Sequence, residues 1–584
     1  MNNFQWIWTY CKQYKTKGVL AVVFILLSSV LIIVNPMITG LLVDQVIAKG
    51  KIELLLPYLG IMIATTVLRT VLRYTYQMIF ERIGQDVLFG IRQDLYKKLQ
   101  ELDFDYFNHN RVGDIMARMT GDTDAIQHFV AWVTYQVAEC ILYFVAALIM
   151  MSTIDFRLML ALLAVTPIIG FLTIKMSKEA QPVFFDIRES FSRLNSMVEE
   201  NISGNRVVKA FVREDYEIEK FNRHNEDYKN QNMKSARVSA KYLPSLDMLA
   251  GSLTLITLIL GGWLVIRGNM TIGNLVTFNG FLWMLNQPMR MSGWLVNDIQ
   301  RFSASCIKIR QMLNTPAQIP TDRNEENVKL KGTVEFDHVS FHFSDDPTTN
   351  VLTDISFKVE PGQTIGILGE TGSGKTTLVN LVSRFYDPSQ GQVLIDGKDA
   401  RKFPVRQLRD GISMVMQDVF LFSNTIEDNI AFGNPYVDNT YIQQVAEIAD
   451  AHSFIMRMPE GYETIVGERG VGLSGGQKQR ISLARALAKD PSILILDDTT
   501  SAVDMETESK IQEELEKITG DKTTFIIAHR ISSVREADEI LMMQKGHVVE
   551  QGTHDELVAK KGMYYDVYRK QLGLTQGGEE NGAQ

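Results

Sequence analysis

The chain has 584 residues, of which 46% are hydrophobic, and a formal net charge of −9. This length exceeds what a single hydrophobic core serves, so we expect at least two domains. The acidic balance, without a basic cluster interleaved with aromatic residues, argues against a nucleic-acid partner. Cys11, Cys140 and Cys306 lie far apart and lack metal-ligand spacing. They favour a reduced, cytosol-facing or membrane-buried chain without a disulfide framework.

Long apolar runs fill the first half of the chain. A bilayer core about 30 Å thick requires about 20 apolar residues in each helix that crosses it. Six segments satisfy this requirement, namely 18–42, 55–80, 126–152, 157–177, 243–266 and 272–297. Lys and Arg gather before the first segment and in the connections after the second and the fourth, whereas the opposite connections are short. The positive-inside rule therefore predicts a multi-pass protein in the lipid of the cell (plasma) membrane, with both termini cytoplasmic.

The two long basic connections keep a helical pattern. They are either solvated charged helices or continuations of the spans about 20–30 Å beyond the membrane. Two turn-like segments, FDYFNHNRVGD (104–114) and ISGNRVVKAFVRED (202–215), stand where such helices would reverse. Their aromatic residues, Gly and Asn favour docking to a cytosolic partner.

Glu139 and Asp247 lie inside expected spans, where ionisable side chains are costly. Two interpretations stay open for them. They either pair with groups on other helices or face water, or they contact a transported substrate. The second interpretation favours cationic amphiphiles.

A strand-like segment, TIGILG, runs into GETGSGKTT (369–377), which fits the P-loop pattern. Glycines let backbone N–H groups surround phosphate oxygens, and the helix that follows directs its positive end at them. In this pattern Lys375 bridges the β- and γ-phosphates and the Thr376 hydroxyl binds Mg²⁺. The expected ATP-binding residues are Gly369, Glu370, Thr371, Gly372, Ser373, Gly374, Lys375, Thr376 and Thr377.

A second apolar strand, ILILD, ends in Asp497, which is the expected Mg²⁺ partner of Thr376. Between the two motifs lies LSGGQ, directly before a helical segment. By spacing alone this segment is either an anion site at a helix N-terminus or a Ser-Gly loop that caps a helix. Its residues are Leu473, Ser474, Gly475, Gly476 and Gln477.

LSGGQ before ILILDD, with a P-loop upstream and IIAHR downstream, resembles the nucleotide-binding domain of ABC transporters. The six fused spans resemble the exporter branch in its half-transporter form. The resemblance implies an α-helical membrane domain (1–310), a linker (311–330), an α/β P-loop domain (331–573) and a flexible tail (574–584). It also implies a dimer in which two ATP molecules lie between the P-loop of one chain and the LSGGQ segment of the other.

Further roles follow from this resemblance alone. Phe343 stands where the family has an aromatic residue that stacks on adenine. Gln417 matches the residue that senses Mg²⁺ and the γ-phosphate, and His529 matches a switch histidine. Ser501 to Asp504 match a loop that communicates across the dimer, and Glu468 matches a segment that contacts the cytosolic loops. Segments 104–114 and 202–215 resemble the coupling helices.

One residue departs from the family pattern. In the family, a Glu normally follows the Asp that ends the second apolar strand, here Asp497, and this Glu positions or deprotonates the attacking water. This chain has Asp498 at that position. Because the Asp side chain is one methylene shorter than that of Glu, its carboxylate lies roughly 1.5 Å nearer the main chain. A misplacement of about 1 Å can cost about 100-fold in rate. We therefore expect a site that holds ATP-Mg²⁺ and cleaves it slowly.

With an intact LSGGQ, the chain resembles the degenerate subunit of heterodimeric bacterial multidrug exporters. We expect a second half-transporter that carries the catalytic Glu, and a lipophilic or amphiphilic substrate. A homodimeric drug or lipid exporter with slow sites and an ATP-sensing membrane regulator are the alternatives.

Overall fold

The computed structural model describes residues 2–319, 329–499 and 505–572. It divides into two compact units. The helical unit comprises Met1–Gln100 and Val112–Thr315, and the α/β unit comprises Glu101–Arg111 and Pro316–Gln584. The short segment 101–111 thus groups with the α/β unit, although it lies between two helices of the other unit in sequence. Most of the expected linker after residue 319 and the tail at 574–584 lie outside the described residues.

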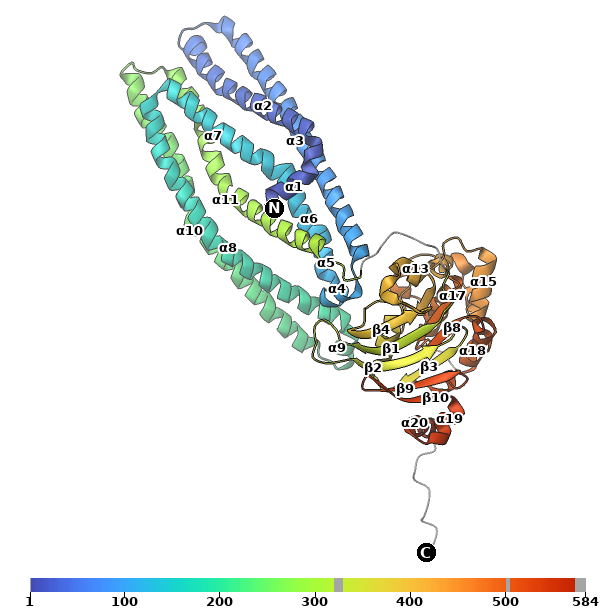
Figure 1. Ribbon diagram of the computed structural model, residues 1–584. Helices are drawn as coiled ribbons and strands as arrows, with labels where there is room; N and C mark the ends of the chain where they lie inside the picture. The colour runs from blue at the N-terminus through green and yellow to red at the C-terminus, as the bar shows by residue number, and fades with distance from the viewer. Residues whose placement is uncertain (1, 320–328, 500–504, 573–584) are drawn as a thin grey trace. The chain divides into compact units, whose positions relative to one another are not determined.

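Long helices make up the first part of the chain (Figure 1). They are α1 (Asn3–Cys11), α2 (Lys15–Leu41), α3 (Leu55–Glu101), α4 (Phe104–His109), α5 (Val112–Ala117), α6 (Thr123–His128), α7 (Thr134–Ile154), α8 (Phe156–Ser203), α9 (Asn205–Ala210), α10 (Glu214–Ile266) and α11 (Ile272–Asn314). Helices α3, α8 and α10 have 47, 48 and 53 residues, so the expected continuation of spans as helices is confirmed. The short helices α4 and α9 follow the ends of α3 and α8.

Among the described residues, five helical segments are long and apolar enough to cross a membrane. They are Asn3–Ile47, Ile52–Glu101, Val112–Ile154, Phe156–Ser203 and Glu214–Ile266. Helix α11, which contains the expected sixth span, is long enough at 43 residues but is not among them. Its expected span contains Asn274, Asn279, Asn286 and Gln287, whose amides lower the mean hydropathy. The sixth span stays a prediction.

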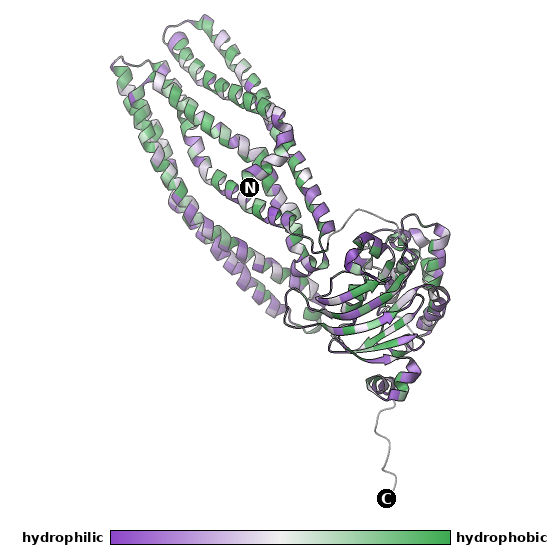
Figure 2. Ribbon diagram, viewed as in Figure 1, coloured by the Kyte–Doolittle hydropathy of each residue, from purple (hydrophilic) through white to green (hydrophobic). Residues whose placement is uncertain are grey.

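Hydropathy changes along the longest helices. Figure 2 shows α8 and α10 hydrophilic toward α9 and hydrophobic toward their other ends. In the apolar part of α3, side chains such as Leu56, Ile63 and Val67 are exposed at 78%, 65% and 57%. Exposed apolar surface of this extent requires lipid or a partner protein to cover it.

The described residues of the α/β unit form two sheets. The strands are β1 (Val334–Phe341), β2 (Leu352–Val359), β3 (Thr364–Gly369), β4 (Gln390–Ile395), β5 (Lys398–Asp399), β6 (Ile412–Val415), β7 (Ile493–Asp497), β8 (Thr523–Ile527), β9 (Glu539–Gln544) and β10 (His547–Gly552). An antiparallel sheet has the order β2-β1-β4-β5. The larger sheet has the order β10-β9-β3-β8-β7-β6, in which only the β10 pairing is antiparallel.

Helices lie beside the strands of this unit (Figure 1). They are α12 (Lys375–Val382), α13 (Val405–Asp410), α14 (Ile426–Ala431), α15 (Asn439–Ile448), α16 (His452–Ile455), α17 (Gly475–Ala488), α18 (Met505–Thr519), α19 (His554–Lys560) and α20 (Met563–Gln571). All five residues of β7 are buried, as expected for a central parallel strand. Parallel strands present their carboxyl ends at one edge of a sheet, which is where ligands bind in such folds.

Candidate functional site

The predicted phosphate loop connects β3 to the N-terminus of α12. Gly374 is the N-cap of α12 with φ +100°, where a Cβ would lie 2.7 Å from Leu352. Gly372 has φ +82° and open space where a Cβ would stand. Both backbone conformations favour glycine. The loop therefore adopts the concave turn that a phosphate group requires.

Two polar side chains in this loop are suited to an anion. Lys375 Nζ donates to the carbonyl oxygens of Gly369 and Glu370, over 2.8 and 2.9 Å. Ser373 Oγ is buried and has no hydrogen-bond partner among the described residues. Burial lowers the pKa of the Lys375 ammonium, and the carboxylates of Asp497 and Asp498 oppose this shift. A bound polyphosphate would favour the charged lysine in the same way.

Asp497 ends β7 directly beside the loop and is 3% exposed. The Thr376 hydroxyl donates to its Oδ2 over 2.9 Å. Burial raises the pKa of the Asp497 carboxyl, while Thr376, Lys375 and His529 act in the opposite direction. A carboxylate and a hydroxyl in direct contact are suitable oxygen ligands for Mg²⁺.

These groups line a cavity of about 230 Å³. Its lining residues are Val351, Thr371, Gly372, Gly374, Lys375, Thr376, Thr377, Gln417, Asp497, Asp498, Ile527 and His529. His529 is exposed at the cavity, so it is not a core histidine. The backbone turn, the lysine and the oxygen pair fit a nucleoside triphosphate with a divalent cation.

The backbone of Asp498 is held on both sides. Its N–H donates to the Ile527 carbonyl over 2.9 Å, and its own carbonyl accepts from Gln479 Nε2 over 3.3 Å. Asp498 has φ +51°, in the left-handed region, which Asp enters more readily than most residues. Because the main chain is fixed in this way, the reach of the carboxylate depends on the length of the side chain.

The remaining predicted residues lie at varying distances from this cavity. Phe343 is half-buried and does not line it. In the LSGGQ segment, Ser474 Oγ accepts from the Gln477 N–H over 3.3 Å, and Gln477 Oε1 accepts from the Ser474 N–H over 2.9 Å. This capping box begins α17, so within one chain the segment caps a helix, and Ser474 is exposed. Glu468 is also exposed, and Ser501 to Asp504 lie outside the described residues.

The helical unit contains a polar cluster around Glu139. This α7 residue is 2% exposed and accepts a hydrogen bond from the hydroxyl of Tyr76 on α3. Arg69 and Arg73, also on α3, lie within electrostatic range of Tyr143 on α7. The two arginines were not predicted as site residues, although ionisable residues inside an expected span are a signal that could have identified them. Asp247, by contrast, is exposed on α10.

The chain combines a P-loop site with a set of long apolar helices. This combination defines a membrane protein with a nucleotide-binding domain. The family described as "ABC transporter transmembrane region" matches residues 19–289, and that described as "ABC transporter" matches residues 352–501. The chain is 37% identical to the uncharacterized ABC transporter ATP-binding protein YknU of Bacillus subtilis, with 97% of each chain covered. It is 36% identical to the probable multidrug resistance ABC transporter ATP-binding/permease protein YheI of the same organism, with 98% of each covered.

A bacterial Atm1-family ABC exporter, solved with ATP bound, has a similar structure. The TM-score is 0.80 at 26% identity, and 97% of this chain and 99% of that chain are covered. The chain therefore belongs to the ABC transporter family, as an exporter half-transporter with an N-terminal membrane domain and a C-terminal nucleotide-binding domain. The predicted fold class is confirmed, and the protein is an ATPase-coupled multi-pass membrane transporter.

Asp497→Asn tests the cost of burying the Asp497 carboxylate. Since the folded-state pKa is raised, the folded protein binds more protons than the unfolded chain, and stability falls as pH rises through that pKa. The cost is fully present at neutral pH. Asn keeps an acceptor for Thr376 without the charge, so the nucleotide-free variant should melt about 2–4 °C higher at pH 7.5, as about 1 kcal/mol would give.

Thermal unfolding of the full chain in detergent and EDTA measures this difference, which should shrink as pH is lowered. Added ATP-Mg²⁺ should stabilise the unmodified chain more than the variant. Asp521→Asn, at an exposed aspartate before β8, is the matched control. A variant that melts lower without nucleotide would contradict the account of Asp497.

Proposed function

We propose that the chain is one subunit of a heterodimeric exporter of lipophilic or amphiphilic compounds, and that its own ATP site is the slow one. The proposal is carried by one observation at Asp498. Hydrogen bonds fix its backbone, and its side chain, which is one methylene shorter than that of Glu, lines the cavity beside the phosphate loop. Named relatives that include a probable multidrug resistance transporter support the substrate class. Lys and Arg placement supports cytoplasmic termini in the plasma membrane.

ATP binding and cleavage depend on different residues at this site. Lys375, the loop amides and Thr376 hold the triphosphate, and Thr376, Asp497 and Gln417 hold Mg²⁺. Asp498 orients the attacking water, and His529 contacts the γ-phosphate. A shorter side chain at residue 498 changes how the attacking water is oriented, and it leaves the contacts that bind ATP in place. The site should therefore bind ATP with ordinary affinity and cleave it slowly.

The intact LSGGQ segment has a separate role in this proposal. Leu473, Ser474, Gly475, Gly476 and Gln477 complete the ATP site of the partner half-transporter, in which a Glu performs cleavage. The exposed position of Ser474 at the start of α17 supports this role, since a helix N-terminus attracts phosphate oxygens. Within the chain the segment is satisfied by its own capping box, so ATP binding across the dimer does not require it to refold.

Asp498→Glu should raise the rate of ATP cleavage at this site, by up to about 100-fold if acid reach alone limits it. Single-turnover cleavage by the full chain in lipid nanodiscs measures this rate. Asp498→Asn, which keeps the length and removes the charge, is the matched control and should lose the remaining activity. A Glu variant no faster than the unmodified chain would overturn the assignment of Asp498.

The partner is tested by the activity of the purified chain. Alone, it should bind ATP-Mg²⁺, hydrolyse it slowly and transport no substrate. Co-expression with a half-transporter that carries Glu after the Asp equivalent to Asp497 should give a two-chain complex with brisk ATPase activity and drug efflux. Brisk hydrolysis and transport by this chain alone would instead support a homodimer, and ATP binding without flux in any complex would support a regulator.

Glu139→Gln tests whether the membrane-embedded carboxylate recognises cations. Because Glu139 is buried and accepts the Tyr76 hydroxyl bond, we propose that it joins α3 to α7 and does not contact substrate. Gln keeps an acceptor for Tyr76, so the efflux of cationic and of neutral dyes should fall by the same small factor. Asp247→Asn, on the exposed side of α10, is the comparison variant. A loss confined to cationic dyes would contradict this role.

A further inference from the structure

A side chain from α20 holds the main chain at His529, which follows β8 and lines the cavity beside the phosphate loop. Gln571, the last residue of α20, donates through Nε2 to the His529 carbonyl over 2.8 Å. Its Oε1 accepts a hydrogen bond from the Ile531 N–H over 2.9 Å. One side-chain amide therefore bridges the main chain on both sides of Arg530.

The main chain at His529 has weak support from the sheet. The Ala528 N–H donates to the Ile367 carbonyl over 3.3 Å, which is longer than usual for such a bond. Among the described residues, no main-chain group bonds the His529 carbonyl or the Ile531 N–H. The Gln571 amide satisfies both groups, so the position of the His529 peptide depends on it.

The segment after His529 is anchored by a different helix. Glu508 of α18, which is 4% exposed, accepts from Arg530 Nη1 over 3.0 Å and from Ser533 Oγ over 2.5 Å. These bonds hold the chain beyond Arg530 and do not touch the His529 carbonyl. Gln571 is therefore the side chain that acts on the peptide of the histidine itself.

Helix α20, which carries Gln571, is fixed at its start. Glu550 on β10 accepts from the Met563 N–H over 2.5 Å and from the Tyr564 N–H over 3.0 Å. The Tyr564 side chain is fully buried, and its hydroxyl lies 2.6 Å from His554 Nδ1 of α19. Because α20 has only nine residues, this attachment also limits the movement of Gln571 at its end.

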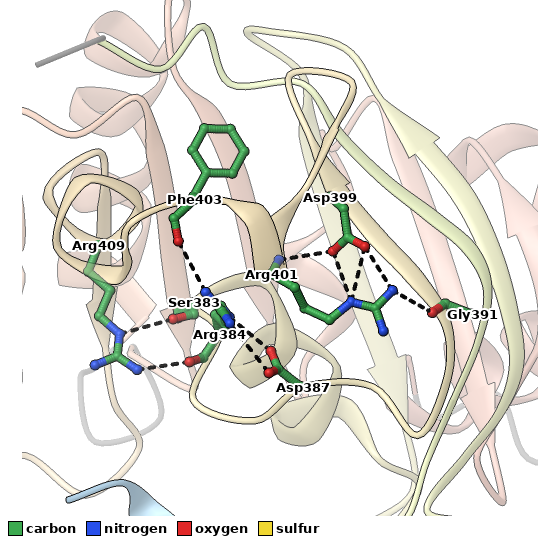
Figure 3. Close-up of polar contacts among 8 residues, drawn as sticks. All are labelled: Ser383, Arg384, Asp387, Gly391, Asp399, Arg401, Phe403 and Arg409. Carbon is green, nitrogen blue, oxygen red and sulfur yellow. Dashed lines mark hydrogen bonds and ion pairs between the residues drawn. The ribbon is translucent and has the colours of Figure 1, made fainter. Parts of the chain in front are cut away.

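The phosphate side of the cavity is fixed independently of α20. Helix α12, which begins at the phosphate loop, ends in a turn that Arg384 and Arg409 hold (Figure 3). Arg384 is 5% exposed and donates to Asp387 over 2.9 Å. Arg409 donates to the carbonyls of Ser383 and Arg384 over 3.2 and 2.8 Å, which satisfies the C-terminal end of α12. A displacement of His529 is therefore not matched by a shift of the phosphate loop.

We propose that Gln571 is a positioning residue, which holds the His529 main chain so that the imidazole reaches the γ-phosphate of ATP. The inference rests on the proposed function, in which His529 contacts the γ-phosphate. ADP lacks this group, and its phosphates are held by Lys375 and the loop amides. Gln571 should therefore affect the binding and cleavage of ATP and leave the binding of ADP unchanged.

Two substitutions of Gln571 test this role. Gln571→Leu removes both hydrogen bonds. Gln571→Glu keeps the length and the acceptor for the Ile531 N–H, but places a carboxylate oxygen against the His529 carbonyl. Each should raise the Kd for ATP by about fivefold, as loss of one contact would, with the Kd for ADP unchanged. Lys570→Ala, at the exposed residue before Gln571, is the matched control and should leave both Kd values unchanged.

Titration of the full chain in lipid nanodiscs with ATP and with ADP measures these values, in EDTA to prevent cleavage. The unchanged Kd for ADP also shows that a variant is folded. Weaker binding of both nucleotides by the same factor in the two Gln571 variants would mean a purely structural role and would overturn the proposal. Unchanged Kd values for ATP in both variants would overturn it as well.

His529→Ala separates the proposal from the proposed function on which it rests. This variant should raise the Kd for ATP and not that for ADP, and adding Gln571→Leu should have no further effect, because both changes remove the same contact. A further loss in the double variant would contradict the positioning role. If His529→Ala leaves the Kd for ATP unchanged, the contact of His529 with the γ-phosphate fails and the inference with it.

Single-turnover cleavage at saturating ATP-Mg²⁺ gives a second readout. Gln571→Leu should cleave about tenfold more slowly than the unmodified chain, as a displacement of about half an ångström would give. Rates are compared as ratios between variants, so the outcome does not depend on whether the site itself is slow. An unchanged rate in Gln571→Leu would contradict the positioning role and leave the assignment of Asp498 intact.

Discussion

The backbone at the end of β7 is the constraint on which the site depends. Five buried residues bring Asp497 to the edge of the sheet, where it meets the Thr376 hydroxyl. The chain then turns through the left-handed conformation at Asp498, whose N–H and carbonyl are both hydrogen-bonded. A buried parallel strand tolerates little displacement, since its neighbours on both sides fix its register. The backbone positions of both aspartates therefore follow from the fold, and the length of each side chain sets how far its carboxylate reaches.

Under the proposed assignment of Asp498, this constraint separates the retention of ATP from its cleavage. Lys375, the loop amides and Thr376 belong to elements unaffected by the length of residue 498. An exporter with one slow site can then use ATP at that site mainly to hold the dimer together, while the other site supplies the cleavage steps.

Much of this architecture could be predicted from residues alone. The P-loop between β3 and α12, the carboxylate strand β7 and the long helices each have a strong local pattern of glycines, apolar runs or basic connections. Contacts distant in sequence could not be predicted. Nothing local indicates that Gln479 holds the Asp498 carbonyl, that Tyr76 bonds Glu139, or that Gln571 bonds the His529 carbonyl, because each pair depends on tertiary packing. The sixth span is ambiguous for a physical reason, since its amide side chains lower the apolar signal.

The identity of the nucleotide that stays bound tests the central claim most directly. The purified chain, incubated with ATP-Mg²⁺ and then freed of unbound nucleotide, should retain mainly intact ATP over many turnover times of an ordinary exporter, which are on the order of 0.1 s. Chromatography of the nucleotide released on denaturation measures the ratio of ATP to ADP. Bound nucleotide that is mainly ADP, with phosphate released at an ordinary exporter rate, would contradict the account.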